Sequence, residues 1–480
     1  MKKILAFVLV LMMVVSMVAC GGTPATTPAT TAPATTPATT VPPTSGLDPD
    51  DPLYKSGIGE VDLNERVFTI ANAAGTTLTG VVEGSLQQQK LAEMYSVLGE
   101  RFNCSFEFLP DAATSLFSNA YPVLMSGETY ADALYSTYWS LGYFVYNGYA
   151  MNMDDISTIQ SEQDYWTKVG DEVGRLWEKQ YVLTPNVSFA WEYAWGVFFN
   201  KAMAEDLGLP DLYQLVRDGK WTIEKFGEYV NMATKDNGDN VWTGEDSYGW
   251  GGPHNDVDLA MFIGAGGEML RKDENGKWLL NTGTAETMNL VSELREVLKN
   301  GIYDLSGGES WGYYYDMFQE DRMLFAPYPA VGSKWYFSEM DDFGFLPLPK
   351  LNDQQTGYYS YMDHNTYGFL IPSNVEKLEE VGLVLDAIAC YSQAVIEPML
   401  LEQYELTDFR DEESMEMLNI IRETLTVMPV ITLLSMVDMS IMNATSFAVA
   451  AALVQGIDFA AEYEAHAELT QLTIDTMLGQ

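Results

Sequence analysis

Apolar runs and helically spaced apolar positions alternate through the stretch that follows residue 60. The strand-like runs stand at 66–71, 104–109 and 131–135. Between the first two runs, Leu91, Met94, Leu98 and Phe102 recur at helical spacing, and residues 116–125 predict another helix before the third run. This βαβαβ pattern predicts a parallel sheet with helical crossovers, whose ligands bind at the carboxyl ends of the strands.

The alternation resumes near residue 196. The expected elements are a strand at 196–200, a short helix at 201–207, a helix capped by Thr222, a hairpin turn at 273–276 and a helix from Met288 to Leu298. Residues 367–371 predict one more strand. A capping box at 373–376 predicts the start of a helix that runs to Tyr391.

The last part of the chain is expected to be mainly helical. Residues 425–455 are apolar enough to raise the question of a membrane span, but Pro429, Asp438 and Asn443 interrupt them. We therefore predict buried helices in this stretch.

The amino-terminal segment predicts export. Two lysines precede an almost wholly apolar run from Ile4 to Val18, and Cys20 stands where a small-residue cleavage site is expected. The end of this run resembles a bacterial lipobox, in which the cysteine is acylated. Residues 1–19 are thus expected to form a signal peptide, and Cys20 to be the lipidated first residue of the mature protein. Residues 20–46 are rich in Thr and Pro and predict an extended tether.

Composition narrows the range of partners. Hydrophobic residues make up 47% and aromatic residues 12% of the 480 residues, which predicts a well-packed globular protein of two or three domains. The net charge of −43 disfavours nucleic acid and anionic lipid. Cys104 and Cys390 are expected to pack in the core, and a disulfide between them stays open. The three histidines lie far apart in the sequence, so we expect neither a metal site nor a cofactor.

Several short motifs follow one another in a specific order. They are the segment from Trp195 to Lys201, then Gly208-Leu209-Pro210, Trp221-Thr222-Ile223-Glu224, the Gly-Gly turn at 264–268, and Asp342 to Pro349 with its Pro-x-Pro ending. In this order they resemble the family 1 extracellular solute-binding proteins of bacterial ABC importers. The resemblance implies an α/β fold of the two-lobe, periplasmic-binding-protein-like (Venus flytrap) kind, in which each lobe is a doubly wound sheet with helices on both faces.

The same resemblance implies the domain organisation and the function. The N-terminal lobe is expected to comprise residues 61–190 plus 364–405, and the C-terminal lobe residues 191–363 plus 406–480. A ligand that bridges the lobes would stabilise their closed arrangement. The expected protein is a monomeric substrate-binding lipoprotein on the extracellular face of the cytoplasmic membrane. It would deliver a small-molecule solute, with an oligosaccharide favoured, to separate ABC permease subunits in the membrane.

A sugar site needs flat aromatic platforms together with planar polar groups. Trp139 is expected in the loop that follows the third predicted strand. The other candidates lie near the expected hinges or in Gly- and Pro-rich loops: Trp191, Glu192, Trp195, Trp250, Trp311, Tyr328 and Asp363, with Tyr313 and Trp335 beside them. For any single tryptophan, core packing is the commoner role. The set therefore supports a sugar site better than any one member does.

Other functions stay open beside sugar import. Import of a peptide or a polyamine is the main alternative, and the acidity of the chain modestly favours a cationic ligand. A secreted glycoside hydrolase is a further alternative, because paired carboxylates in an aromatic groove serve both binding and hydrolysis. The motif from Gly308 to Gly312 matches G-x-S-x-G but lacks the preceding strand and following helix of a nucleophile elbow. We therefore expect no enzyme activity.

Overall fold

The computed structural model describes residues 47–75, 78–79, 84–186, 190–252, 256–301, 312–362, 365–426, 429–453 and 455–480. The expected signal peptide and lipidation site lie outside the described residues, as do Trp311, Asp363 and the serine of the G-x-S-x-G motif. These predictions are therefore not addressed by the geometry that follows.

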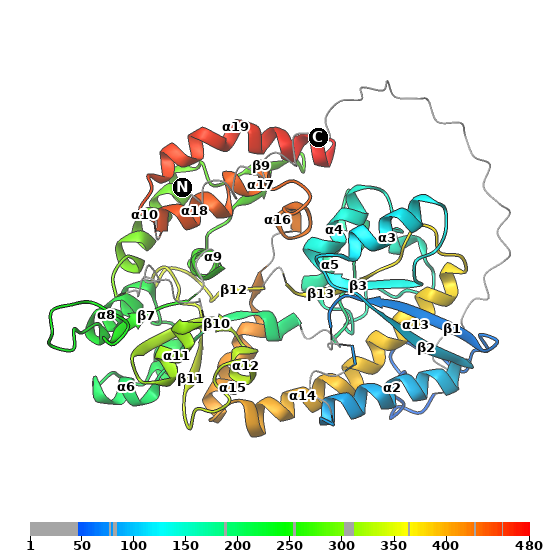
Figure 1. The fold of residues 1–480 in the computed structure, drawn as a ribbon, viewed down its shortest axis with the longest axis horizontal. Helices are drawn as coiled ribbons and strands as arrows, with labels where there is room; N and C mark the ends of the chain where they lie inside the picture. Colours follow the sequence, from blue (N-terminus) through cyan, green and yellow to red (C-terminus); the bar gives the residue numbers. More distant parts are fainter. Residues whose placement is uncertain are drawn as a thin grey trace, which may run out of the picture. The chain divides into compact units, whose positions relative to one another are not determined.

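The first sheet has the strand order β13-β3-β1-β2 (Figure 1). Its strands are β1 (Arg66–Asn72), β2 (Cys104–Pro110), β3 (Ala133–Thr137) and β13 (Tyr367–Leu370). Strand β1 runs parallel to β2 and β3, whereas β13 is antiparallel to β3. The βαβαβ unit predicted from the sequence is confirmed, and a strand from much later in the chain completes its sheet.

Helices cover both faces of this sheet. They are α2 (Leu86–Phe102) and α13 (Leu378–Tyr391) on one face, and α3 (Leu116–Met125) and α4 (Tyr138–Tyr146) on the other (Figure 1). Because successive side chains of a strand point to opposite faces, Phe68 and Ile70 pack with Met94 of α2, whereas Ala71 packs with Leu116 of α3. This alternation explains why residues 66–71 read as a strand that is buried on both sides.

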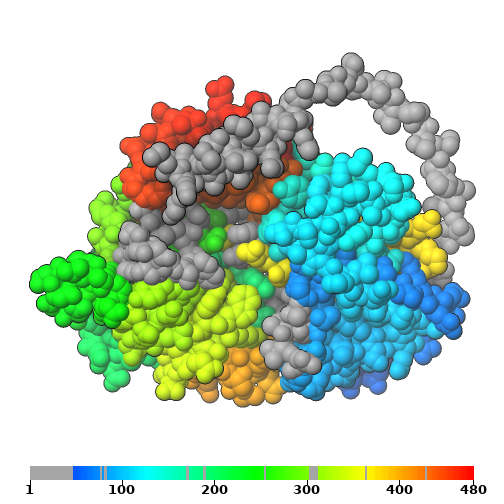
Figure 2. All heavy atoms as spheres, viewed as in Figure 1, coloured from blue at the N-terminus to red at the C-terminus, as the bar shows by residue number. Residues whose placement is uncertain are grey.

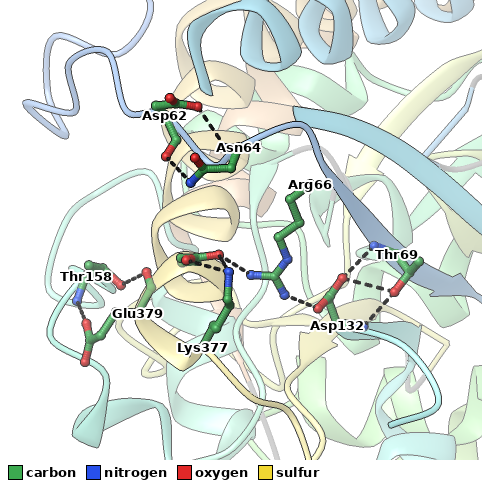
Figure 3. A network of polar contacts seen from close by, with 9 residues as sticks. Asp62, Asn64, Arg66, Thr69, Asp132, Thr158, Lys377 and Glu379 are labelled. Atoms are coloured by element: carbon green, nitrogen blue, oxygen red, sulfur yellow. Dashed lines mark hydrogen bonds and ion pairs between the residues drawn. The ribbon is translucent and has the colours of Figure 1, made fainter. Parts of the chain in front are cut away.

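A polar network fixes the amino end of β1 to the start of α13 (Figure 3). The guanidinium of Arg66 lies between the carboxylate of Asp132, which it contacts, and that of Glu380, 2.7 Å away. Asp132 also accepts hydrogen bonds from the backbone N–H of Thr69 at 2.8 Å and from its hydroxyl at 3.0 Å. These contacts lie at the end of the sheet opposite the carboxyl ends of its parallel strands, so they hold the scaffold together.

The second sheet has the strand order β11-β6-β10-β7. Its strands are β6 (Trp195–Phe199), β7 (Tyr248–Trp250), β10 (Met323–Pro329) and β11 (Gly344–Pro347). Strand β6 is antiparallel to β10 and β11, and β10 is parallel to β7. The helices in and around this sheet are α6 (Lys201–Asp206), α7 (Leu212–Arg217), α8 (Ile223–Ala233), α9 (Asp256–Gly264), α10 (Ala285–Leu298), α11 (Tyr313–Gln319) and α12 (Gly332–Trp335). The predicted cap of α8 is confirmed, since the hydroxyl of Thr222 accepts from the N–H of Lys225 at 3.4 Å.

The Pro-rich segment around Tyr328, which the sequence predicted to be a loop, is strand β10, so that expectation of a loop was wrong. Proline in an inner strand is unfavourable because it cannot donate a ladder hydrogen bond. Here the pairing of β10 with β7 ends at Phe325, opposite Trp250. Pro327 comes two residues after that last pair, beyond the end of β7, so no carbonyl of β7 lacks a hydrogen bond because of this proline. On the opposite side, β10 remains paired with β6.

The predicted capping box at 373–376 was also wrong. Helix α13 begins at Leu378, and the residue before it, Lys377, has a left-handed backbone with a φ of 53° and makes no side-chain cap. The side chain of Asn374 instead donates to the carbonyls of Leu124 and Glu128 at 2.6 and 3.2 Å. A tertiary contact to the end of α3 therefore replaces the local capping interaction.

Two small hairpins, one parallel pair of short strands and a group of helices complete the described chain. They are η2 (Met153–Asp155), α5 (Lys168–Gly174), β4 (Arg175–Leu176), β5 (Lys179–Gln180), η4 (Ala190–Tyr193), β8 (Leu270–Lys272), β9 (Trp278–Leu280), β12 (Ser360–Tyr361), α15 (Glu412–Glu423), β14 (Leu425–Thr426), α16 (Pro429–Leu434), α17 (Ser440–Asn443), α18 (Ser446–Leu453) and α19 (Phe459–Leu478). Val430, Leu433 and Val449 are buried, which confirms the predicted buried helices of this stretch.

Within the described part of the chain, one helical run is long and apolar enough to cross a membrane by composition. It extends over Leu378–Asp408 and consists of α13, η6 (Ser392–Ile396), α14 (Glu397–Gln403) and η7 (Tyr404–Asp408). In its most apolar window 72% of the residues are buried inside the protein. We interpret this run as a core helix.

Helix α16 packs against α4 through a close backbone contact. A Cβ placed on Gly142 of α4 would lie 1.7 Å from the carbonyl oxygen of Leu433 in α16. The hydroxyl of Tyr143 donates to the carbonyl of Met436, just after this helix. Figure 2 shows the orange segment around α16 meeting the cyan surface that includes α4. The segment after β14 is therefore fastened to a helix of the first sheet.

Candidate functional site

The candidate site begins at the ligand-binding edge of the first sheet. Strand β3 leads directly into α4, so Trp139 lies in the first turn of that helix, beside the carboxyl end of the strand. Its indole N–H donates to the side-chain oxygen of Asn365 at 3.4 Å. Asn365 precedes β13, whose antiparallel direction brings its start to the same edge. The antiparallel pairing of β13 with β3 thus brings the side chains of Trp139 and Asn365 together.

A row of aromatic rings leads away from this edge. Tyr135 of β3 and Tyr367 of β13 are stacked, with ring centroids 5.8 Å apart. Tyr193 of η4 meets Tyr367 at 5.8 Å and Trp335 of α12 at 6.1 Å, both edge-on. Trp335 is 48% exposed, which is unusual for a tryptophan that has aromatic neighbours. The row therefore connects the first sheet to the helix after β10 and offers an open ring at its end.

A second aromatic group lies at the matching edge of the second sheet. Trp195 opens β6 and lies beside Tyr328 of β10, with ring centroids 5.7 Å apart. Tyr328 meets Tyr315 at 5.0 Å and Tyr336 at 5.2 Å. The ring of Trp195 is almost fully buried, whereas Tyr328 is partly exposed. Tyr328 is therefore the member of this group that a ligand can reach.

A buried charged group joins η4, α12 and η7. The carboxylate of Glu192 accepts hydrogen bonds from the ammonium of Lys334 at 2.6 Å and from the hydroxyl of Tyr404 at 2.9 Å. Lys334 also lies 4.2 Å from the centroid of the Tyr404 ring and 3.5 Å from the carboxylate of Asp408. Glu192 thus has an internal partner for its charge, as a buried carboxylate requires.

The surroundings of this group perturb its titration. Burial raises the pKa of Tyr404 far above its ordinary value, and the nearby Glu192 carboxylate adds to the rise. The phenol therefore remains a neutral donor. Burial also raises the pKa of the Asp408 carboxyl, while the Lys334 ammonium opposes that rise.

Trp191 and Trp250 lie inside the protein. Trp191 packs edge-on against Tyr404 at 5.0 Å, and the guanidinium of Arg422 lies 5.5 Å from its ring centroid. Trp250, the last residue of β7, is 0% exposed and donates its indole N–H to the carbonyl of Asn300 at 3.1 Å. Of the candidates that the structure describes, Trp139 and Tyr328 lie partly exposed at the ends of the two sheets, Glu192 and Trp195 lie buried beside them, and Trp191 and Trp250 lie deeper.

Three members of the aromatic row were not candidates from the sequence. Tyr135 and Tyr367 stand in strand-like runs, and Tyr193 stands between two tryptophans that drew attention instead. Strand pairing between segments that are far apart in the sequence brings them together. The only local signal was their position at the ends of predicted strands.

Comparison with known proteins defines the class. A model of the family described as bacterial extracellular solute-binding protein matches residues 107–389, more than half of the chain. No curated protein sequence matches the chain. Solved structures share the two-lobe fold of maltose-binding proteins, and the described chain has the corresponding α/β architecture.

Three of these structures illustrate the likeness. An ABC substrate-binding protein from Listeria monocytogenes in complex with cycloalternan is 12% identical, with a TM-score of 0.57 over 87% of this chain and 100% of that one. A cyclo/maltodextrin-binding protein complexed with maltotetraose is 13% identical, with a TM-score of 0.61 over 86% and 98%. The sugar-binding protein MalE from Xanthomonas citri is 10% identical, with a TM-score of 0.61 over 86% and 97%.

The fold and the family together define an ABC-type solute-binding protein. This chain belongs to the bacterial extracellular solute-binding protein family. The family and its structural relatives are binding proteins rather than enzymes.

Proposed function

We propose that this protein captures an oligosaccharide between its two lobes and delivers it to an ABC permease. The observation that carries the proposal is the aromatic row, because it ends in the half-exposed ring of Trp335 and has Trp139 and Asn365 near its other end. Indole and phenol faces pack on the apolar C–H faces of sugar rings, and amides bind their hydroxyls.

The proposal includes the boundaries of the lobes. The N-terminal lobe would comprise residues 61–190 plus 364–405, and the C-terminal lobe 191–363 plus 406–480. Glu192 lies at one proposed crossing, where it pairs with Lys334 of the same lobe and accepts a hydrogen bond from Tyr404 of the N-terminal lobe. Closure around a ligand would be favoured because the ligand contacts aromatic rings from both sides, which gives it a higher affinity for the closed state.

The proposal also includes the location. Cys20 would carry the lipid, and residues 20–46 would hold the binding domain away from the membrane surface. Structural relatives are described as complexes with maltotetraose, cycloalternan and maltotriose. These names support a saccharide for this chain, while peptide and polyamine ligands are the outcomes that a test has to separate from it.

The test is calorimetric titration of the chain without residues 1–19 against oligosaccharides, short peptides and polyamines. We expect saturable binding of a saccharide and none of the other two classes. Replacing Trp335 by Ala should weaken binding about tenfold, because stacking and apolar burial at one indole contribute about 1.4 kcal/mol.

Trp242 offers a matched control for Trp335. It is 55% exposed and meets a single tyrosine, Tyr248, edge-on at 5.6 Å. Trp242→Ala should therefore leave the affinity unchanged. Binding of a peptide or polyamine alone, release of reducing sugar from the titrant, or equal effects of the two substitutions would overturn the proposal.

A further inference from the structure

A separate cavity lies between two hairpins, apart from the aromatic edges described above. Its volume is about 540 Å³, within the usual range of sites for small molecules. Hairpin β4–β5 and the adjoining α5 contribute Glu172, Arg175 and Trp177, and hairpin β8–β9 contributes Lys272 and Trp278. None of these residues takes part in the site proposed for the interlobe ligand.

Trp177 is held in an unfavourable backbone conformation at the tip of its hairpin. Trp177 and Glu178 form the two-residue turn between β4 and β5, and both are left-handed, with φ values of 50° and 60°. Asn-Gly and similar pairs normally occupy such turns, because a left-handed backbone costs free energy for other residues. A bulky residue at this position is a strained feature of the kind that clusters at ligand sites.

The strained turn presents its tryptophan to the cavity on a fixed support. The ring of Trp177 is 38% exposed and meets Tyr181 edge-on at 6.0 Å. Arg175 binds the carboxylate of Asp154 through both terminal nitrogens, at 2.9 and 3.2 Å. The backbone N–H of Gln180 donates to the side chain of Asn152 at 3.1 Å. The hairpin is therefore anchored at its base while its tip remains open.

The opposite hairpin is anchored equally well. The side chain of Gln480 accepts from the N–H of Trp278 at 3.0 Å and donates to its carbonyl at 2.9 Å. Gln471 donates to the same carbonyl at 2.9 Å. The ammonium of Lys272 lies 5.0 Å from the centroid of the Trp278 ring. The second indole is thus positioned before any ligand arrives, which lowers the entropy that binding costs.

We propose that this cavity is a second saccharide site, which takes one or two sugar rings beside the indoles of Trp177 and Trp278. Sugar hydroxyls would bind the planar groups of Glu172 and Arg175 at its rim. The charged lining is balanced, with Glu172 and Glu178 against Arg175 and Lys272, so it favours a neutral ligand over a polyamine or a phosphate. By the lobe boundaries proposed above, the two hairpins belong to different lobes, so this cavity is also bordered by both lobes, but its lining shares no residue with the aromatic row. The inference therefore does not depend on what binds at the row.

Fluorine NMR of the protein labelled with 5-fluorotryptophan tests the site directly. Trp177→Phe and Trp278→Phe assign the two signals, and the probes are maltotriose, cellotriose, xylotriose, trialanine and spermidine. We expect at least one trisaccharide to shift both signals saturably below about 10 mM, well above the concentration that half-fills a weak site with a Kd of roughly 1 mM. The shifts should persist in Trp335→Ala, which separates this cavity from the aromatic row.

A second variant distinguishes binding from folding. Asn tolerates a left-handed backbone, so Trp177→Asn should raise the melting temperature while it weakens saccharide binding at this cavity at least tenfold. The proposal is overturned if none of the trisaccharides shifts either signal, if trialanine or spermidine alone does so, or if Trp177→Asn binds as well as the parent protein.

Discussion

Replacing Gly142 by Ala should have two opposite effects on stability: a gain in helix propensity and a loss of packing between α4 and α16. Within a helix such as α4, Gly→Ala is expected to stabilise by about 1 kcal/mol. The added Cβ, however, would lie 1.7 Å from the carbonyl oxygen and 2.9 Å from the carbonyl carbon of Leu433. Both neighbours are backbone atoms, so a rotamer change cannot relieve the contact.

The size of the effect follows from the distance that α16 has to move. Ordinary contact between a carbon and an oxygen needs roughly 3.2–3.5 Å, so α16 must retreat by about 1.5–2 Å. That movement loosens the packing of Leu433 and Leu434, both 0% exposed. Overpacking of this kind costs about 1–3 kcal/mol, and partial exposure of two leucines adds to it. We expect a net loss of about 2 kcal/mol in the free energy of unfolding.

Two measurements check this expectation. Urea unfolding followed by circular dichroism gives the change in stability, and hydrogen–deuterium exchange should show faster exchange in residues 429–437. Gly59→Ala is the matched control, because no described atom lies within 4 Å of its added Cβ. A Gly142→Ala protein that is as stable as its parent, or more stable, would refute the close packing of α16 on α4.

Three further predictions concern buried polar groups. Burial raises the pKa of Asp386 above its ordinary value of 3.8, so the folded state binds this proton more tightly than the unfolded state does. The stability advantage of the parent protein over Asp386→Asn should therefore shrink as the pH rises from 3.8 through the raised pKa. Urea titrations in which this advantage grows over the same pH window would contradict the prediction. Glu192→Gln should cost about 2 kcal/mol of unfolding free energy, since the ammonium of Lys334 loses its 2.6 Å partner, and Lys334→Met in the same chain should recover part of the loss. Cys104 and Cys390 are both free thiols. Two thiols should therefore react with a disulfide reagent after unfolding in the chain that starts at residue 21, and dithiothreitol should not change its melting temperature.

Local patterns were sufficient for the parallel strands of the first sheet and for helices α2 and α3, but not for α4, where a loop was expected around Trp139. Strands β1 and β2 and helix α3 follow from runs whose burial and periodicity are set within the segment itself. The start of α13 could not be predicted, because the side chain of Asn374 donates its hydrogen bonds to carbonyls at the end of α3, which is distant in the sequence. Strand β10 was hidden by its prolines, which are tolerated only because β7 ends before Pro327.

The sequence predicted which types of residue form the candidate site, but not which particular residues lie together in it. Sugar chemistry directs attention to tryptophans, and Trp139 does lie at the expected edge. The neighbours that give it a context, such as Tyr193 and Tyr367, are recognised only when distant strands are paired. Aromatic content alone also could not separate Trp250, sealed in the core, from Trp335, open to solvent.

The pairing of β13 with β3 bears on how the chain is made. Strand β3 has no partner on that edge until residue 370 has left the ribosome, because β13 closes the sheet from far along the chain. Closing so large a loop is slow, so the first sheet stays incomplete while the rest of the chain is made. For a protein that we propose is exported, this delay is useful, since an unfolded thread passes through a translocation pore and a finished sheet does not.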